Sequence, residues 1–301
     1  MLIADILNAK YFSQICRDDA DFKKLALLLH PDRCKDSRAN EAFTHLNSLR
    51  DEFIKGRAYK DESGEFRSNG FTHTWSGDTA LLYKSYTNYG KLMAAMKKVY
   101  NADDMKHWMQ YFPDNYTYNN TVQFTTVERC YPLSYMLSGI ENDPNKYKHI
   151  NWVFSRMIEV CVMLEDIGWS LLNFSPESVF ILPDRHGILI PSYYYLTEYG
   201  KKVEFISGRC KYWYPSFLLR DKICQPGIDI TLAQKLTISN LGDKSGSGVI
   251  LKLNKEINSS VLSYLMKPAR TDLSNNSLES MKEWREILHN NFKSEFIKLE
   301  I

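Results

Sequence analysis

The sequence predicts an α+β protein with two parts, a three-helix hairpin and a larger domain that has a small β-rich lobe and a larger helical lobe. Two observations predict this order. Apolar residues recur at helical spacing through the first 55 positions, and strand-like segments then precede long helical ones. The chain has 301 residues, of which 44% are hydrophobic and 25% charged, which fits two globular domains. We expect a hairpin at 1–56, a linker at 57–70 and the larger domain at 71–301, divided into lobes at 71–131 and 132–301.

The hairpin is predicted to contain a short first helix and two longer ones. The first helix is expected from Met1 to Tyr11. The second follows a group of aspartates, since carboxylates near a helix start accept N–H groups and interact favourably with the helix dipole. Pro31 ends the second helix because proline disfavours helical geometry in the residue before it. A third helix is expected from about Arg38, with an apolar stripe at Ala39, Ala42, Phe43, Leu46, Leu49 and Phe53.

The small lobe is expected to begin after a polar stretch that holds three glycines, 55–70. Phe71 to Trp75 and Thr79 to Tyr86 flank Ser-Gly-Asp and are predicted to form a β-hairpin. A helix is expected over 88–111. Thr121 to Glu128 alternates like a strand.

The helical lobe is expected to begin with a short helix after Pro132 and a long apolar helix over 148–167. A strand pair follows, with one strand ending at Leu182, a turn at 183–187 and a second strand at 188–191. The rest is predicted to be mainly helical.

Charge and cysteine patterns exclude several classes of function. The net charge is +2, from 38 basic and 36 acidic residues, so a broad nucleic-acid surface is not expected. The six cysteines form no CxxC pair and have no histidines at zinc spacing, so we expect reduced thiols, no metal and no cofactor. No apolar run reaches the roughly 18 residues of a membrane span. No secretory leader is recognisable. We therefore expect a cytoplasmic protein without membrane contact.

His30-Pro31-Asp32 lies between the second and third predicted helices and follows the basic and apolar run Asp21 to Leu29. This layout resembles a J-domain, the module of DnaJ-like co-chaperones. The alternative is an unrelated helix-turn-helix in which His30 only caps a helix end.

The J-domain resemblance implies that His30, Pro31 and Asp32 contact a DnaK-type heat-shock ATPase and promote its ATP hydrolysis. Pro31 would rigidify the loop, and Asp32 would offer a carboxylate to a partner arginine. The basic residues that would steer association are Lys23, Lys24 and Arg33. Residues 17–35 carry five basic against four acidic side chains, which is less basic than is typical of the family, so recruitment is expected to be weak or selective.

The larger domain resembles a protein kinase over about 70–295. Asn173 to Ile181 resembles the catalytic loop and the strand after it, and Trp213 to Ser216 resembles the end of the activation segment. The resemblance places Asp229 at a buried structural aspartate and Lys84 at the lysine of the third strand. It also places Glu128 to Cys130 at the hinge and Arg270 at a late structural arginine.

The departures from this family remove the groups that phosphoryl transfer requires, a carboxylate base and two metal-binding groups. Asn173 replaces the base, Ser178 replaces the metal-binding asparagine, and Pro191-Ser-Tyr replaces Asp-Phe-Gly. No glycine-rich phosphate loop is recognisable, and the helix predicted at 88–100 lacks a glutamate to pair with Lys84. We therefore expect a pseudokinase-like domain without enzymatic activity, in which Lys84 is either a surface lysine or a residual nucleotide contact.

Three functions stay open at this point. The first is a co-chaperone that stimulates a DnaK-type ATPase and binds an unknown client protein through its kinase-like domain. The second is a decoy, of the kind a virus or mobile element encodes, that blocks other J-proteins without stimulating the chaperone itself. The third is an atypical transferase that binds nucleotide between its lobes.

Overall fold

The computed structural model describes residues 2–9, 12–16, 19–30, 33–55, 57–268, 276–293 and 297–299. Three helices come first, as predicted: α1 (Leu2–Asn8), α2 (Asp19–Leu29) and α3 (Ala39–Lys55), with the 3-10 turn η1 (Phe12–Gln14) between the first two. The predicted ends of the first helix, Met1 and Tyr11, lie outside the described residues.

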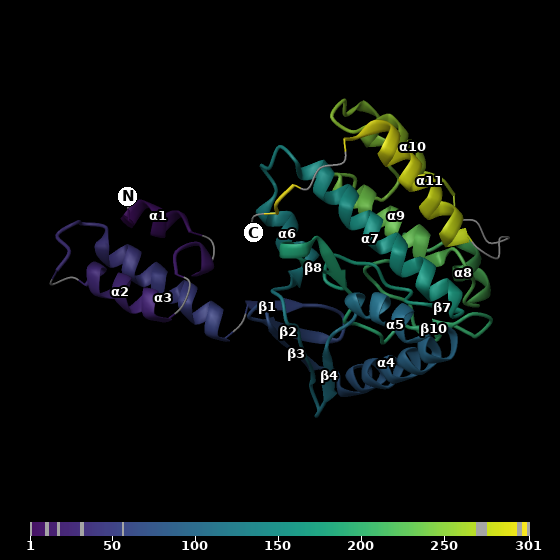
Figure 1. Cartoon of the computed structure of the whole chain (residues 1–301), viewed down its shortest axis with the longest axis horizontal. Coiled ribbons are helices and arrows are strands. Elements are labelled where there is room, and N and C mark those ends of the chain that lie inside the picture. Colours follow the sequence, from purple (N-terminus) through teal and green to yellow (C-terminus); the bar gives the residue numbers. More distant parts are fainter. Residues whose placement is uncertain are drawn as a thin grey trace.

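These helices share a small core of their own. Both α1 and α2 pack on α3, and the three lie beside the rest of the chain in Figure 1. The apolar stripe predicted for the third helix supplies part of this core, which consists of Ile6, Ala9, Phe12, Cys16, Leu29, Ala42, Leu46 and Leu49. This cluster is separate from the large core of the remaining chain. The hairpin is therefore a packing unit in its own right.

The small lobe is built on an antiparallel sheet that has five strands within the described part of the chain. Its strands are β1 (Arg57–Lys60), β2 (Gly64–Ser68), β3 (Thr72–Gly77), β4 (Asn115–Tyr118) and β5 (Val122–Thr125). They lie in the order β1-β2-β3-β5-β4, and every neighbouring pair is antiparallel. The strand predicted over 121–128 corresponds to β5.

The linker predicted at 57–70 is wrong, because β1 and β2 occupy it. Along β2 the side chain of Phe66 is buried, while its neighbours Glu65 and Arg67 are charged and more exposed. A half-buried strand alternates in this way. The charged residues of its exposed face make the segment resemble a polar linker in the sequence. Gly64 adopts a φ of +148°, and a Cβ there would lie 2.2 Å from the Ser76 carbonyl oxygen. The close pairing of β2 with β3 therefore requires this glycine.

The β-hairpin predicted over 71–86 is also wrong in its second half. Residues Thr79–Val99 form the long helix α4. Asp78 caps it by accepting the backbone N–H groups of Ala80 (2.9 Å) and Leu81 (3.1 Å). Its buried side chains recur every three or four positions, at Leu82, Ser85, Asn88, Leu92 and Met96. The helix predicted over 88–111 therefore begins earlier and is divided into α4, α5 (Ala102–Trp108) and the 3-10 turn η2 (Met109–Tyr111).

The helical lobe follows the prediction more closely. Its first elements are β6 (Tyr131–Pro132), α6 (Leu133–Gly139), α7 (Lys146–Asp166), β7 (Trp169–Ser170), β8 (Phe180–Leu182), η3 (Pro183–Arg185), β9 (Gly187–Leu189) and β10 (Thr197–Glu198). The later ones are α8 (Ser216–Asp221), α9 (Ile228–Asn240), η4 (Ile250–Leu253), α10 (Ser259–Leu265) and α11 (Asn276–Asn291). The helix α9 is buried along nearly all of its length and packs on α7, which α11 covers from outside (Figure 1). Among the described helices, none combines the length and apolarity that crossing a membrane would need.

Candidate functional site

The end of α2 carries the first group of predicted site residues. The carbonyl oxygen of His30 accepts the backbone N–H of Arg33 (2.8 Å) and that of Cys34 (3.0 Å). These two bonds make a tight turn directly after the helix. Pro31 and Asp32 lie outside the described residues.

One face of α2 is exposed and leads to His30. Lys23 and Lys24 are exposed on it, and one turn later Leu27 and Leu28 are 51% and 57% exposed. Leu29 lies on the opposite side and is buried in the hairpin core. Adjacent large apolar side chains that stay in solvent are typical of a binding surface. The predicted basic residues Lys23 and Lys24 are thus joined on this face by two leucines that were not among the predicted site residues.

The second group lies where the sheet of the small lobe meets the β8–β9 strand pair, which we call the interlobe interface. Phe180 of β8 meets four aromatic side chains of the sheet there. Its ring centroid lies 5.0 Å from that of Phe66, 5.7 Å from His73, 6.1 Å from Trp75 and 5.9 Å from Phe124. All five side chains are at most 3% exposed. The interlobe interface is therefore filled by aromatic rings.

A histidine and a cysteine lie inside this aromatic cluster. His73 stacks on Phe124 at 4.3 Å, and its Nε2 atom lies 3.3 Å from the Cys130 Sγ atom. Burial lowers the pKa of His73 to about 3 and raises the pKa of Cys130 to about 12. Both groups are consequently neutral at physiological pH, so this pair is a structural contact and not an activated nucleophile.

The turn between β1 and β2 carries two carboxylates, and both accept hydrogen bonds from the segment after β9. Asp61 accepts the hydroxyl of Tyr194 at 3.3 Å, and Glu62 accepts that of Tyr195. Glu62 also accepts the Ser207 hydroxyl (3.0 Å) and the backbone N–H of Arg209 (2.6 Å). We call these contacts the acidic clasp. Two carboxylates would repel a phosphate group at this position.

Asn173 and Ser178, the positions that replace a catalytic base and a metal ligand, are both buried and used locally. The Cys210 thiol donates to the Asn173 side-chain oxygen at 3.7 Å. The Ser178 hydroxyl donates to the Asn173 carbonyl oxygen at 3.3 Å and accepts the backbone N–H of Ser175 at 2.8 Å. Ser178 thus closes the loop on itself, and the Asn173 side chain ties the loop to Cys210.

Asp229 of α9 fixes the start of the same loop. Its carboxylate accepts the backbone N–H groups of Leu171 (2.8 Å) and Leu172 (3.0 Å) and the hydroxyl of Ser170 (2.8 Å). Leu172 has a φ of +55°, a left-handed conformation that costs a residue with a Cβ roughly 1–2 kcal/mol. Burial raises the pKa of Asp229 to about 6, against the opposing effect of its three donors. Asp229 is therefore a buried anchor for a strained loop.

Pro191 begins the segment that leaves β9, and α4 holds this segment in place. The backbone N–H of Tyr193 donates to the Ser85 hydroxyl (2.9 Å), and the Asn88 amide donates to the Tyr193 carbonyl oxygen (2.9 Å). A cavity of only about 10 Å³ is left beside Pro191 and Trp75. That volume suits at most one water molecule.

The assignment of Lys84 to a strand is wrong, because this residue lies on α4. Its ammonium group pairs with Glu204 and sits 4.6 Å from the centre of the Phe205 ring, on the outer side of the segment after β9. The resemblance to a protein kinase and the hairpin predicted over Thr79 to Tyr86 both favour a strand here, but the buried residues of this segment follow a helical spacing. Arg270 lies outside the described residues.

Asn173, Ser178 and Asp229 lie at one loop, 170–178, whereas Pro191 lies beside the cavity of about 10 Å³ at Trp75, which is too small for a nucleotide. Within the described ranges, no group of three or more histidine, cysteine or carboxylate side chains is arranged to hold a metal ion. The aromatic cluster and the acidic clasp were missed by the sequence reading. The only sequence signals for them were the aromatic residues spaced two apart in β3 and the tyrosine run at 193–195.

Neither a model of a known protein family nor a curated protein sequence matches this chain. The fold is similar to the structure of vaccinia related kinase 3, with 12% identity and a TM-score of 0.46, over 78% of this chain and 91% of that one. It is also similar to the kinase domain of a Toxoplasma gondii specific rhoptry antigen, with 13% identity and a TM-score of 0.47, over 77% of this chain and 78% of that one.

Proposed function

We propose that this protein is a J-domain co-chaperone that recruits a DnaK-type heat-shock ATPase through its N-terminal hairpin. In this proposal the larger part is a catalytically inactive kinase-like module that binds a client or partner protein. The chain would then act by accelerating ATP hydrolysis in another protein.

One observation carries the recruitment proposal, the exposed face of α2 that ends at His30. Its two lysines can steer the hairpin toward an acidic partner surface, since complementary charges raise association rates. Its two exposed leucines, Leu27 and Leu28, can supply apolar burial once contact is made. A helix that leaves both charge and large apolar side chains in solvent has the features of a binding face.

The filled interlobe interface supports the absence of phosphoryl transfer. A nucleotide would have to displace buried rings such as Phe66 and Phe180 and approach the carboxylates of Asp61 and Glu62. The positions of the base and metal ligands hold Asn173, whose side-chain oxygen accepts the Cys210 thiol, and Ser178, whose hydroxyl bonds within its own loop. The atypical-transferase alternative would need each of these obstacles to be removed.

A binding measurement tests the recruitment proposal. The full chain is titrated with a purified DnaK-type chaperone in the presence of ATP, and the double variant Leu27→Ser/Leu28→Ser is compared with the wild type. We expect roughly tenfold weaker binding for this variant, the effect of losing central apolar contacts. The matched control is Leu219→Ser/Leu253→Ser, which replaces two leucines that are 44% and 88% exposed in the helical lobe.

Equal affinity of the α2 variant and the wild type would refute recruitment through this face. A loss of affinity in the control variant as well would show that binding depends on exposed apolar surface in general. Only a selective loss in the α2 variant supports the proposal.

A further inference from the structure

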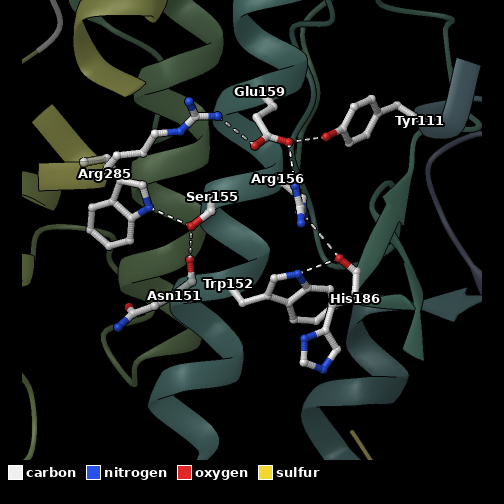
Figure 2. A network of polar contacts seen from close by, with 9 residues as sticks. Tyr111, Asn151, Trp152, Ser155, Arg156, Glu159, His186 and Arg285 are labelled. Carbon is white, nitrogen blue, oxygen red and sulfur yellow. Dashed lines mark hydrogen bonds and ion pairs between the residues drawn. The ribbon is translucent and has the colours of Figure 1, made fainter. Parts of the chain in front are cut away.

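A pocket of about 480 Å³ opens on the helical lobe, away from α2 and the interlobe interface. Its walls are α7, α11, the turn between β8 and β9 at His186, and the chain at Ile297. Figure 2 shows the polar network along one side of it, where Trp152, Arg156 and Glu159 project from α7 toward His186 and Arg285. Its volume lies within the range of about 300–1,000 Å³ that is usual for small-molecule sites.

The charge of the pocket lining is strongly unbalanced. Among the described residues, the lining holds four permanent cations, Lys148, Arg156, Arg285 and Lys293, against one carboxylate, Glu159. That carboxylate is already engaged by the hydroxyl of Tyr111, by Arg156 at 2.8 Å and by Arg285 at 3.3 Å (Figure 2). The lining therefore carries a surplus of positive charge that its own acidic group does not neutralise.

The cations stand beside an apolar wall. Trp152, Leu288, Phe292 and Ile297 line the same space. The Trp152 ring is held in place because its Nε1–H donates to the His186 carbonyl oxygen at 2.6 Å, and the two rings lie 4.5 Å apart. A fixed aromatic surface next to several cations suits a ligand that has an apolar body and an anionic end.

Two further groups are arranged for polar recognition. Asn151 is 7% exposed and lines the pocket, and its Oδ1 atom has no hydrogen-bond partner among the described residues. A buried acceptor of this kind is normally satisfied, so a ligand donor can complete it. Arg285 donates to Glu159 alone within the described structure, and its guanidinium, 62% exposed, has further N–H groups to offer at the pocket mouth.

We propose that this pocket is a binding site for a small organic anion, with its apolar body against Trp152 and Phe292 and its anionic group at Arg285 and Lys293. The shared chemistry is an apolar chain or ring that ends in a carboxylate, phosphate or sulfonate. This site is independent of the proposed recruitment of a chaperone and of the inactive interlobe interface.

The test uses the full chain and two dyes that differ by one sulfonate group. These are 8-anilinonaphthalene-1-sulfonate and its uncharged analogue N-phenyl-1-naphthylamine. Energy transfer from the six tryptophans to bound dye reports binding; Trp152 lines the pocket, and the indole of Trp284 donates to Ser155 of the lining at 2.8 Å. We expect the sulfonate to saturate at one site per chain and the uncharged analogue to bind about tenfold more weakly.

The variant Arg285→Gln/Lys293→Gln removes two exposed cations of the lining and is expected to weaken sulfonate binding about tenfold. The matched control is Lys97→Gln/Lys98→Gln, which removes two exposed cations at the end of α4 and should bind like the wild type. We also expect octanoate or octyl phosphate, but not octanol, to displace the dye. Equal binding of both dyes, an unchanged affinity in the Arg285 variant, or equal displacement by octanol would overturn the proposal.

Discussion

Phe180 of β8 meets Phe66 of β2 edge to face, with ring centroids 5.0 Å apart and ring planes at 85°. This contact joins the two lobes through buried rings instead of leaving a space between them. Edge-to-face aromatic pairs add about 0.5–1.5 kcal/mol beyond the area they bury. The Phe66–Phe180 contact is therefore a stabilised part of the core that holds the two lobes together.

Replacing Phe180, the central ring of the aromatic cluster, should strongly lower the stability of the protein. We expect Phe180→Ala to lower the free energy of unfolding by about 3–5 kcal/mol, because a fully buried phenylalanine is lost and a cavity remains. Urea denaturation followed by far-UV circular dichroism measures this. Phe205→Ala is the control, since that ring is 54% exposed and should cost less than about 1 kcal/mol. Similar losses in both variants would contradict a filled interface.

Asp229 is expected to be indispensable for the fold of its loop. Asp229→Ala leaves two buried N–H groups and one hydroxyl without their acceptor, and each such group costs about 1–3 kcal/mol. We expect a total loss of at least about 3 kcal/mol in the free energy of unfolding, measured by urea denaturation. The control Asp221→Ala removes a carboxylate that pairs only with exposed Arg220, and it should cost little. A stable Asp229→Ala protein would show that the loop does not depend on this anchor.

Stability should fall below pH 6.5 because of His73. Burial lowers its folded-state pKa to about 3, whereas the unfolded chain titrates near 6.5, so between these values the unfolded state binds more protons. The free energy of unfolding should drop by about 2 kcal/mol between pH 6.5 and pH 5 from this residue alone. Thermal unfolding at a series of pH values measures the slope.

His73→Gln should flatten that slope, and His107→Gln, which replaces an exposed histidine, should not. Burial also lowers the pKa of His149 and His186, which adds to the slope, whereas the raised pKa of Asp229 opposes it, so the difference between His73→Gln and the wild type isolates the contribution of His73. An unchanged slope in His73→Gln would mean that His73 does not titrate as its burial requires.

If the acidic clasp holds the segment after β9, the Tyr195 hydroxyl should stabilise that segment. Tyr195→Phe removes the donor to Glu62 and leaves the ring in place. We expect a loss of about 1–3 kcal/mol, the usual effect of removing a hydrogen bond to a charged group. Tyr212→Phe is the control, because Tyr212 is 89% exposed. Faster amide exchange at 194–209 in Tyr195→Phe, and not in the control, would locate the effect. Unchanged exchange there would argue against the clasp.

The sequence predicted the helices well where apolar residues are either regularly spaced or dense. The apolar spacing of α3 is regular, and α7 carries a dense apolar run in which Val160 to Leu164 are all buried. The prediction failed at β1 and β2, whose outward residues are charged, and at α4, whose start is rich in Tyr and Thr. In both places tertiary contacts decide the structure: Phe66 is buried by the aromatic cluster, and Ser85 and Asn88 hold the chain at Tyr193.

The candidate sites were predictable only where the relevant residues are neighbours in sequence. Asn173 and Ser178 are five positions apart, and their loop pattern was recognisable. Glu62 and Tyr195 are 133 positions apart, and no local pattern joins them. The exposure of Leu27 and Leu28 likewise depends on which side of α2 faces α3, which composition does not reveal.

A decoy would bind the chaperone through the same face of α2 and still differ in its effect. It would slow the ATPase activity that another J-protein stimulates and would give no stimulation of its own. A measurement of the ATPase rate therefore distinguishes a co-chaperone from a decoy, whereas a measurement of binding affinity does not.

The most direct test is a measurement of phosphate release from ATP in three mixtures: this chain alone, a DnaK-type chaperone alone, and the two together. We expect no release by the chain alone and faster release by the mixture than by the chaperone. His30→Gln should abolish the acceleration, and the exposed control His107→Gln should retain it. Hydrolysis by the chain alone, or a mixture no faster than the chaperone, would contradict the claim that the hairpin acts through another protein's ATPase.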